Sequence, residues 1–117
     1  MSEEEQREFV RRFYDALDAG DAETASALFP DGTQIELWDG KTFHTREEFR
    51  AWFVKLHSTS DDARREVVSF SVAGDVANVE VVLRANIRGE KKVVRLRHIF
   101  EFEGDRLVRV RVDIEPL

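Results

Sequence analysis

His98 is the residue best suited to do chemistry. It stands in the alternating series Val94, Leu96, His98, Phe100, Phe102, which places it on the inward face of a predicted strand. A buried imidazole must find a hydrogen-bond partner, because an unpaired buried polar group costs about 1–3 kcal/mol. Two interpretations follow: a core histidine bonded to a backbone carbonyl, or an acid/base group in a pocket, since imidazole titrates near neutral pH.

Tyr14 and Asp18 form a second candidate pair, because residues four apart stack on one side of a helix. Tyr14 borders an apolar stripe, and its plain structural interpretation is an amphipathic core residue with its hydroxyl at the rim. Asp18 stands in the last turn, where the helix dipole repels an anion. It is either a surface residue without a role or the partner of a cation such as Arg65.

The direction of Arg65 depends on the register of its strand. Phe70 shares a phase with Val68, which places Arg65 on the opposite face. Because Val67 is apolar too, a β-bulge near Val68-Ser69 would switch the phase and turn Arg65 and Val67 inward. The sequence is compatible with both registers, with Arg65 turned outward or inward.

Other chemistries are excluded or disfavoured by residue type. The chain has no cysteine, which excludes disulfides, thiolate metal sites and cysteine nucleophiles. His44, His57 and His98 come from separate predicted elements without ligand-like spacing, so we expect no metal site. No P-loop, GxSxG or GxGxxG motif occurs. The inward strand positions carry no Asp or Glu, which argues against paired-carboxylate hydrolysis.

Length and charge set further bounds. A chain of 117 residues with 42% hydrophobic residues can bury one continuous core, so we expect a single domain over residues 1–117. The net charge of −6 disfavours nucleic acid or an anionic membrane as a partner. The apolar runs are too short to span a bilayer and the first residues are acidic, so we expect a soluble, cytoplasmic protein.

The first third of the chain predicts helices and a hairpin. A capping box, Ser2-x-x-Glu5, starts a helix that ends at Gly20, and Asp21 caps a short second helix that Pro30 stops. A hairpin follows, with Asp39-Gly40 as a predicted type I′ turn between residues 33–38 and 41–44.

A third helix and a long run of strands complete the chain. Thr45-x-x-Glu48 is a second capping box, and it opens a helix with Phe49, Trp52 and Phe53 on one face. From Arg64 onward, apolar and polar residues alternate with a period of two. This alternation predicts antiparallel strands over about 64–72, 76–88, 91–102 and 106–115, joined by Gly74-Asp75, Gly89-Glu90 and Gly104-Asp105 turns. Helices first and a meander after is an α+β arrangement.

The element order resembles the NTF2-like superfamily, and the segment from Phe9 to Asp21 with Leu28-Phe29 is similar to the opening of SnoaL-type domains. The resemblance implies an NTF2-like cone, with N-terminal helices packed on a strongly curved, mostly antiparallel sheet that encloses a pocket. Members of this superfamily include isomerases, epoxide hydrolases, dehydratases and non-catalytic binders, so the fold alone does not assign a function.

A closer resemblance covers nearly the whole chain. The stretches Arg11-Arg12-Phe13-Tyr14, Leu37-Trp38-Asp39-Gly40, Arg46-Glu47-Glu48-Phe49-Arg50 and Arg65-Glu66 resemble the de novo designed NTF2-like luciferases of the LuxSit family. The resemblance implies two catalytic pairs, Tyr14 with His98 and Asp18 with Arg65. It also implies a luciferin-binding set, in which Ser60, Leu96 and Val110 agree with the optimised form of that pocket. We expect the remaining binding side chains to be Phe13, Leu17, Trp38 and Trp52.

The implied reaction is oxidation of a synthetic imidazopyrazinone luciferin, diphenylterazine or a coelenterazine analogue, by O2 with light emission. Neither a metal nor an organic cofactor is expected, and O2 is the co-substrate. We expect a monomer, because alternating Arg and Glu on the outer sheet face are typical of a solvated surface. Two alternatives stay open: a module that binds a flat aromatic molecule without turnover, and a bare scaffold whose pocket is filled by large side chains.

Overall fold

The first helix forms as its capping signals predict. In the computed structural model, which describes residues 1–115, α1 spans Glu3–Asp18. The hydroxyl of Ser2 accepts from the Glu5 backbone N–H, and the Glu5 carboxylate accepts from the Ser2 N–H. Of the apolar stripe of α1, Val10, Phe13, Tyr14 and Leu17 are buried and Phe9 is partly buried. Gly20 follows with φ +69°, a left-handed conformation that glycine adopts without penalty.

A short helix and a small hairpin follow. Helix α2 (Ala22–Ala27) is capped by Asp21, and β1 (Gln34–Glu36) pairs antiparallel with β2 (Thr42–Phe43). The predicted type I′ turn is wrong, because of its two residues only Gly40 has positive φ. The Gly40 N–H instead donates to the Leu37 carbonyl, and the Leu37 N–H donates to Lys41. This longer loop ends in a left-handed glycine, the other common hairpin solution.

Helix α3 spans Arg46–His57. The Thr45 hydroxyl accepts from the Glu48 backbone N–H, as expected of an N-cap. The second half of the predicted capping box differs. The Glu48 carboxylate accepts from the backbone N–H of His44, one residue before the cap. In this arrangement, too, backbone N–H groups at the start of α3 have side-chain acceptors.

The four long strands are confirmed, with shifted ends. They are β3 (Ser60–Ala73), β4 (Val76–Ile87), β5 (Glu90–Glu103) and β6 (Arg106–Glu115), each antiparallel to the next. Strand β3 begins four residues before the predicted position. Between β4 and β5 the turn is Arg88-Gly89, both at positive φ, and not Gly89-Glu90.

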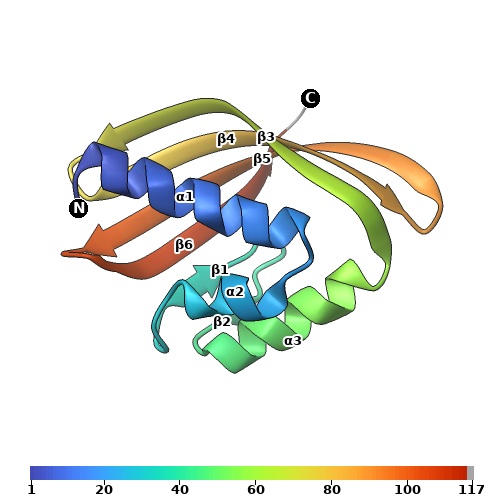
Figure 1. Ribbon diagram of the computed structural model, residues 1–117, viewed down its shortest axis with the longest axis horizontal. Helices are drawn as coiled ribbons and strands as arrows, with labels where there is room; N and C mark the ends of the chain where they lie inside the picture. Colours follow the sequence, from blue (N-terminus) through green and yellow to red (C-terminus); the bar gives the residue numbers. More distant parts are fainter. Residues whose placement is uncertain (116–117) are drawn as a thin grey trace.

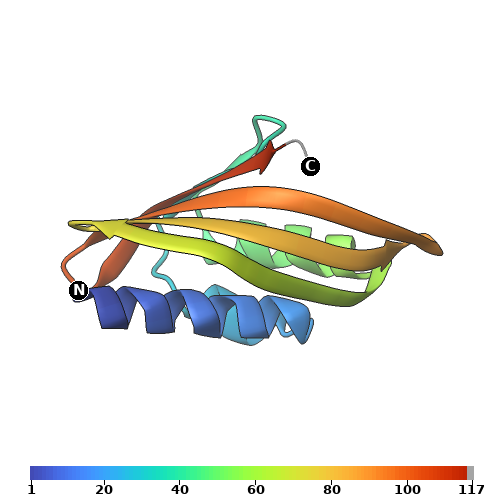
Figure 2. The ribbon, with the colours of Figure 1, turned by 90° about the horizontal axis from the view of Figure 1, so that it is seen from above.

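The strands form one six-stranded sheet in the order β2-β1-β6-β5-β4-β3, in which only β1 and β6 are parallel. Figure 1 shows α1 running across the long strands, with α2 and α3 beside β1 and β2. In Figure 2 the sheet curves over helices that lie on one of its sides. The core fills the space between sheet and helices, and its fully buried members include Phe29, Val79, Val81, Phe100 and Leu107. The predicted α+β arrangement, with N-terminal helices packed on a curved, mostly antiparallel sheet, is therefore confirmed.

The outer face of the sheet is charged, as the alternation predicted. Ion pairs join Arg97 to Glu80 and to Glu115, and Arg109 and Arg111 both reach Glu36. Among residues 1–115, no helix is both long enough and apolar enough to cross a membrane.

Candidate functional site

A β-bulge decides where Arg65 points. The β3–β4 register shifts between Val67 and Ser69, at the predicted position, and Arg65 then pairs with Leu83 and Val67 with Val81. The Arg65 side chain is only 9% exposed. The inward register is thus the one that forms. Val67 takes the same face as buried Val81 but stays 45% exposed, because β3 is an edge strand.

Arg65 meets Asp18 from the last turn of α1. The distance from Nη1 of Arg65 to Oδ1 of Asp18 is 2.7 Å, and the Arg65 backbone N–H donates to Oδ2 at 3.0 Å. This explains a carboxylate placed against the helix dipole: a buried cation and a backbone amide compensate it. The Nε of Arg65 is buried and has no hydrogen-bond partner among the described residues.

Tyr14 and His98 form the second pair. The Tyr14 hydroxyl lies 3.0 Å from Nδ1 of His98, and both side chains are buried. Burial lowers the pKa of His98 to about 3, and the charge of Arg65 adds to the effect. Burial also raises the pKa of Tyr14 far above its ordinary value, while Arg65 opposes that rise. Both groups are therefore neutral near pH 7, with a fixed cation close to them.

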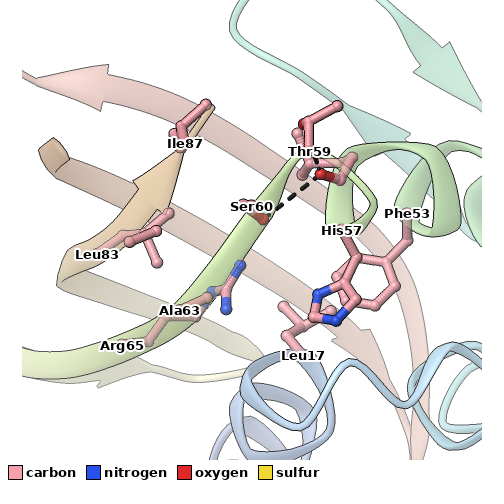
Figure 3. Close-up of a pocket in the computed structure, with 11 residues that line it drawn as sticks. Leu17, Phe53, His57, Thr59, Ser60, Ala63, Arg65, Leu83 and Ile87 are labelled. Carbon is pink, nitrogen blue, oxygen red and sulfur yellow. Dashed lines mark hydrogen bonds between the residues drawn. The ribbon is translucent and has the colours of Figure 1, made fainter. Parts of the chain in front are cut away.

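A small cavity of about 60 Å³ opens beside Arg65. Figure 3 shows it between the end of α3, the start of β3 and strand β4. Arg65 and His57 are its charged or titratable members, while Leu17, Leu83 and Ile87 supply apolar walls. The cavity is mostly apolar, so a charge on a bound molecule would meet Arg65 in a poorly hydrated environment.

The predicted binding residues are only partly brought together. Leu17 and Ser60 line the cavity. Phe13, Leu96 and Val110 lie in the core, where Phe13 contacts the ring of Tyr14 and Leu96 pairs with Val81 across β4. Trp52 is half-buried against the rings of Phe43 and Phe49. Trp38 is 47% exposed at the tip of the β1–β2 hairpin and does not reach the cavity.

Several cavity residues were not among the sequence candidates. His57 is the most notable: its ring stacks on Phe53 and packs against the backbone of Gly20. His57 follows Phe53 by four residues, so it lies on the aromatic face of α3. This spacing could have identified His57 as a candidate from the sequence. Within residues 1–115, no group of three or more His, Asp or Glu side chains is placed to hold a metal ion.

Comparison with known proteins agrees with the fold. A family model described as "SnoaL-like domain" matches residues 10–110. No curated protein matches the sequence. Many solved structures do match. An NTF2-like protein of unknown function from Burkholderia pseudomallei has a TM-score of 0.86 at 20% identity, covering 98% of this chain and 92% of its own.

Two further solved structures show that proteins with different ligands and activities share this fold. An epoxide hydrolase from M. tuberculosis has a TM-score of 0.81 at 15% identity, covering 95% of this chain and 83% of its own. A protein from Catenulispora acidiphila with a ketosteroid isomerase-like fold, in complex with trimethylamine, has a TM-score of 0.82 at 18% identity. That match covers 90% of this chain and 83% of the other. At these identities the likeness concerns the fold alone.

Proposed function

The chain belongs to the SnoaL-like domain family, and we propose that it is a cofactor-independent luciferase built on the NTF2-like fold. The observation that carries the proposal is the presence of two side-chain pairs, Asp18 with Arg65 at 2.7 Å and Tyr14 with His98 at 3.0 Å. Tyr14, His98 and the Arg65 side chain are buried, and the Asp18 side chain is 26% exposed. These are the pairs that the resemblance to designed luciferases implies. Their substrate would be an imidazopyrazinone such as diphenylterazine or a coelenterazine analogue.

The reaction needs an anion in a dry site. The luciferin loses a proton, and its anion is oxidised by O2 to a dioxetanone. That ring releases CO2, which takes one oxygen atom of O2, while the other remains in the excited amide that emits. The costly step for the protein is to stabilise the anion without water.

Arg65 is suited to that task. Its guanidinium is held by the Asp18 carboxylate and is almost fully buried, so it is oriented before the substrate arrives. Preorganised donors at developing negative charge are worth about 10²–10³ in kcat when one is removed. We therefore assign Arg65 to the luciferin anion, and Asp18 to holding Arg65 in position.

His98 is assigned as a neutral group. A ring with a pKa of about 3 is a poor proton acceptor near pH 7, so the role of general base does not suit it. Tyr14 keeps its proton and can donate it to Nδ1 of His98, which leaves the ring proton on Nε2. In that tautomer Nε2 is a hydrogen-bond donor. His98 does not line the cavity beside Arg65, so it can polarise a luciferin only if the molecule extends from that cavity into the core.

The size of the cavity favours a second candidate. Pockets for drug-sized ligands are about 300–1,000 Å³, whereas the cavity beside Arg65 is about 60 Å³. A luciferin fits only if lining side chains such as Leu83 and Ile87 move apart. A domain that binds a smaller molecule without turnover needs no such movement, and a bare scaffold needs no ligand at all.

The test is luminescence on mixing purified protein with diphenylterazine or coelenterazine in aerated buffer. We expect light from the parent and a loss of at least about a hundredfold in Arg65→Ala. Arg84→Ala is the matched control, because it removes an arginine from an exposed ion pair on the neighbouring strand. Darkness with both luciferins, while a titration shows saturable binding, would establish the binder. Darkness without binding would establish the scaffold.

A further inference from the structure

The proposed reaction uses a proton acceptor, and the two side-chain pairs do not contain a suitable one. His98 has a pKa of about 3 and does not line the cavity beside Arg65. Burial raises the pKa of Tyr14, so its hydroxyl keeps its proton near pH 7. Asp18 is bonded to Arg65 and does not line the cavity, and a guanidinium accepts no proton. The luciferin must lose a proton before it reacts with O2, so we looked for a further residue at the cavity.

His57 is the one titratable side chain besides Arg65 on the wall of this cavity, among residues 1–115. It is the last residue of α3. Figure 3 shows it on the α3 side of the cavity, across from Leu83 and Ile87 of β4. A luciferin that moves these two side chains apart therefore comes to lie against His57. Imidazole gains and loses its proton near neutral pH, which suits a general base.

The ring of His57 is held by packing and not by hydrogen bonds. It stacks on Phe53, with ring centres 5.9 Å apart and an angle of 25° between the planes, and its Nε2–Cε1 edge packs against the backbone of Gly20. Within residues 1–115 neither ring nitrogen has a hydrogen-bond partner, and neither is among the fully buried polar atoms. A lone pair on the ring is therefore available to a proton of a bound molecule.

Arg65 is the charged group that faces His57 across the cavity. The lining residues that α1 and β4 supply are apolar, and Lys55 of α3 does not line the cavity. Asp21, next to Gly20, uses its carboxylate to cap α2. In the part of the chain described, no carboxylate lies within 4.0 Å of the His57 imidazole. A proton that His57 accepts is therefore not held there by a counter-ion.

We propose that His57 is the general base of the cavity, an inference that rests on the proposed luciferase function. A ring nitrogen of neutral His57 forms a bond to the luciferin proton, and the electron pair of the broken bond stays on the luciferin. The products are an imidazolium and an anion beside Arg65. After O2 has added and CO2 has left, the imidazolium returns its proton to the amide product. His57 thus affects how fast the anion forms, and Arg65 affects how stable it is.

The first experiment follows anion formation without oxygen. Diphenylterazine is mixed with the protein under nitrogen, and the absorbance of the luciferin anion is recorded with time. His57→Gln should slow anion formation about a hundredfold and change its final amount little. His57→Phe, which keeps the stack on Phe53, should be equally slow, and Arg65→Ala should lower the final amount. His44→Gln is the matched control, because His44 is exposed and does not line the cavity.

A second experiment, in aerated buffer, separates a base from a packing residue. The kcat for light emission of the parent should fall at low pH, where imidazole is protonated, and His57→Gln should lack this dependence. His57→Ala leaves a space beside Phe53. Imidazole added to the buffer should restore its kcat with saturation, whereas pyrazole, a ring of the same size but a much weaker base, should not.

The outcomes distinguish this inference from the luciferase proposal. Unchanged anion formation in His57→Gln overturns the role of His57, even if the parent emits light. Equal rescue by imidazole and pyrazole also overturns it, because it shows that the ring only fills space. A parent that forms the anion through His57 but stays dark supports His57 and contradicts the luciferase proposal. A parent that neither binds nor ionises diphenylterazine overturns both.

Discussion

The carboxylate of Asp18 holds Arg65 twice, through the side-chain Nη1 at 2.7 Å and through the backbone N–H at 3.0 Å. It thereby joins the last turn of α1 to the edge strand β3 at one point. The same contact fixes the cation that faces the cavity and that, together with burial, lowers the pKa of His98. The stability of the fold and the electrostatics of the site therefore depend on the same pair.

Asp18→Ala should lower the free energy of unfolding by about 3 kcal/mol, because it leaves a guanidinium that is nine-tenths buried without its counter-ion. Glu66→Ala is the control. Its partner is Arg84, both side chains are more than half exposed, and its loss should cost less than about 1 kcal/mol. Urea unfolding of both variants measures the difference. Equal losses would show that the Asp18–Arg65 pair contributes no more than a surface pair.

Stability should fall as the pH is lowered from about 6.5 to about 3, because of His98. Its folded pKa of about 3 lies below the ordinary 6.5, so in that window the unfolded chain binds a proton that the folded chain does not. The contribution is complete above pH 6.5. One such proton is worth about 1.4 kcal/mol per pH unit.

His98→Phe removes this dependence. Urea unfolding between pH 4 and 6 should give a slope of the unfolding free energy against pH that is smaller in His98→Phe than in the parent by about 1.4 kcal/mol per unit. Loss of the Tyr14 hydrogen bond shifts the whole curve of the variant but not this slope. Parallel curves would contradict a neutral, buried His98.

The elements of the fold were predictable because a few neighbouring residues decide them. Ser2, Asp21 and Thr45 each cap the helix that they precede. The turns at Gly74-Asp75, Gly89-Glu90 and Gly104-Asp105, together with the alternation of apolar and polar side chains, predicted four antiparallel strands. The β1–β2 turn was not predicted, because Asp39-Gly40 is compatible with two loop lengths and only the pairing of Leu37 with Lys41 distinguishes them.

The candidate site was predicted less completely, because its geometry depends on irregular backbone. Either register of β3 turns an apolar residue, Val67 or Val68, toward the inner face of the sheet, so the direction of Arg65 was left open until the bulge was located. A second irregularity, with Asp62 at φ +52°, interrupts the alternation at the start of β3 and concealed that Ala63 lines the cavity. Trp38 was expected at the binding site from its residue type, but an aromatic side chain in a hairpin turn lies outside the cone.

Gly20→Ala should be more destabilising than Gly40→Ala, although both glycines have positive φ. The strain of an alanine at positive φ costs about 1 kcal/mol at either position. At Gly20 the added methyl would also overlap the His57 imidazole, whereas nothing lies within 4 Å at Gly40. We expect about 2–3 kcal/mol for Gly20→Ala in thermal or urea unfolding.

A double-mutant cycle identifies the source of that difference. His57→Ala in the Gly20→Ala background should restore the part caused by overlap, so the two substitutions should couple favourably. If they are additive, His57 does not pack on Gly20 in solution, and its place in the cavity wall would need revision.

Leu83→Ala should lower the KM for the luciferin several-fold while kcat changes little. Leu83 forms part of the wall of a cavity of about 60 Å³, and a luciferin displaces it on binding. Removing it in advance saves that cost in the ground state and the transition state alike, which is the signature of uniform binding. The unfolding free energy should fall by about 1–2 kcal/mol, since the side chain is half-buried.

Val93→Ala is the control, because it lies on an exposed part of β5, and it should change neither KM nor kcat. A KM that is unchanged or higher in Leu83→Ala would place the luciferin elsewhere than this cavity, even if the parent emits light.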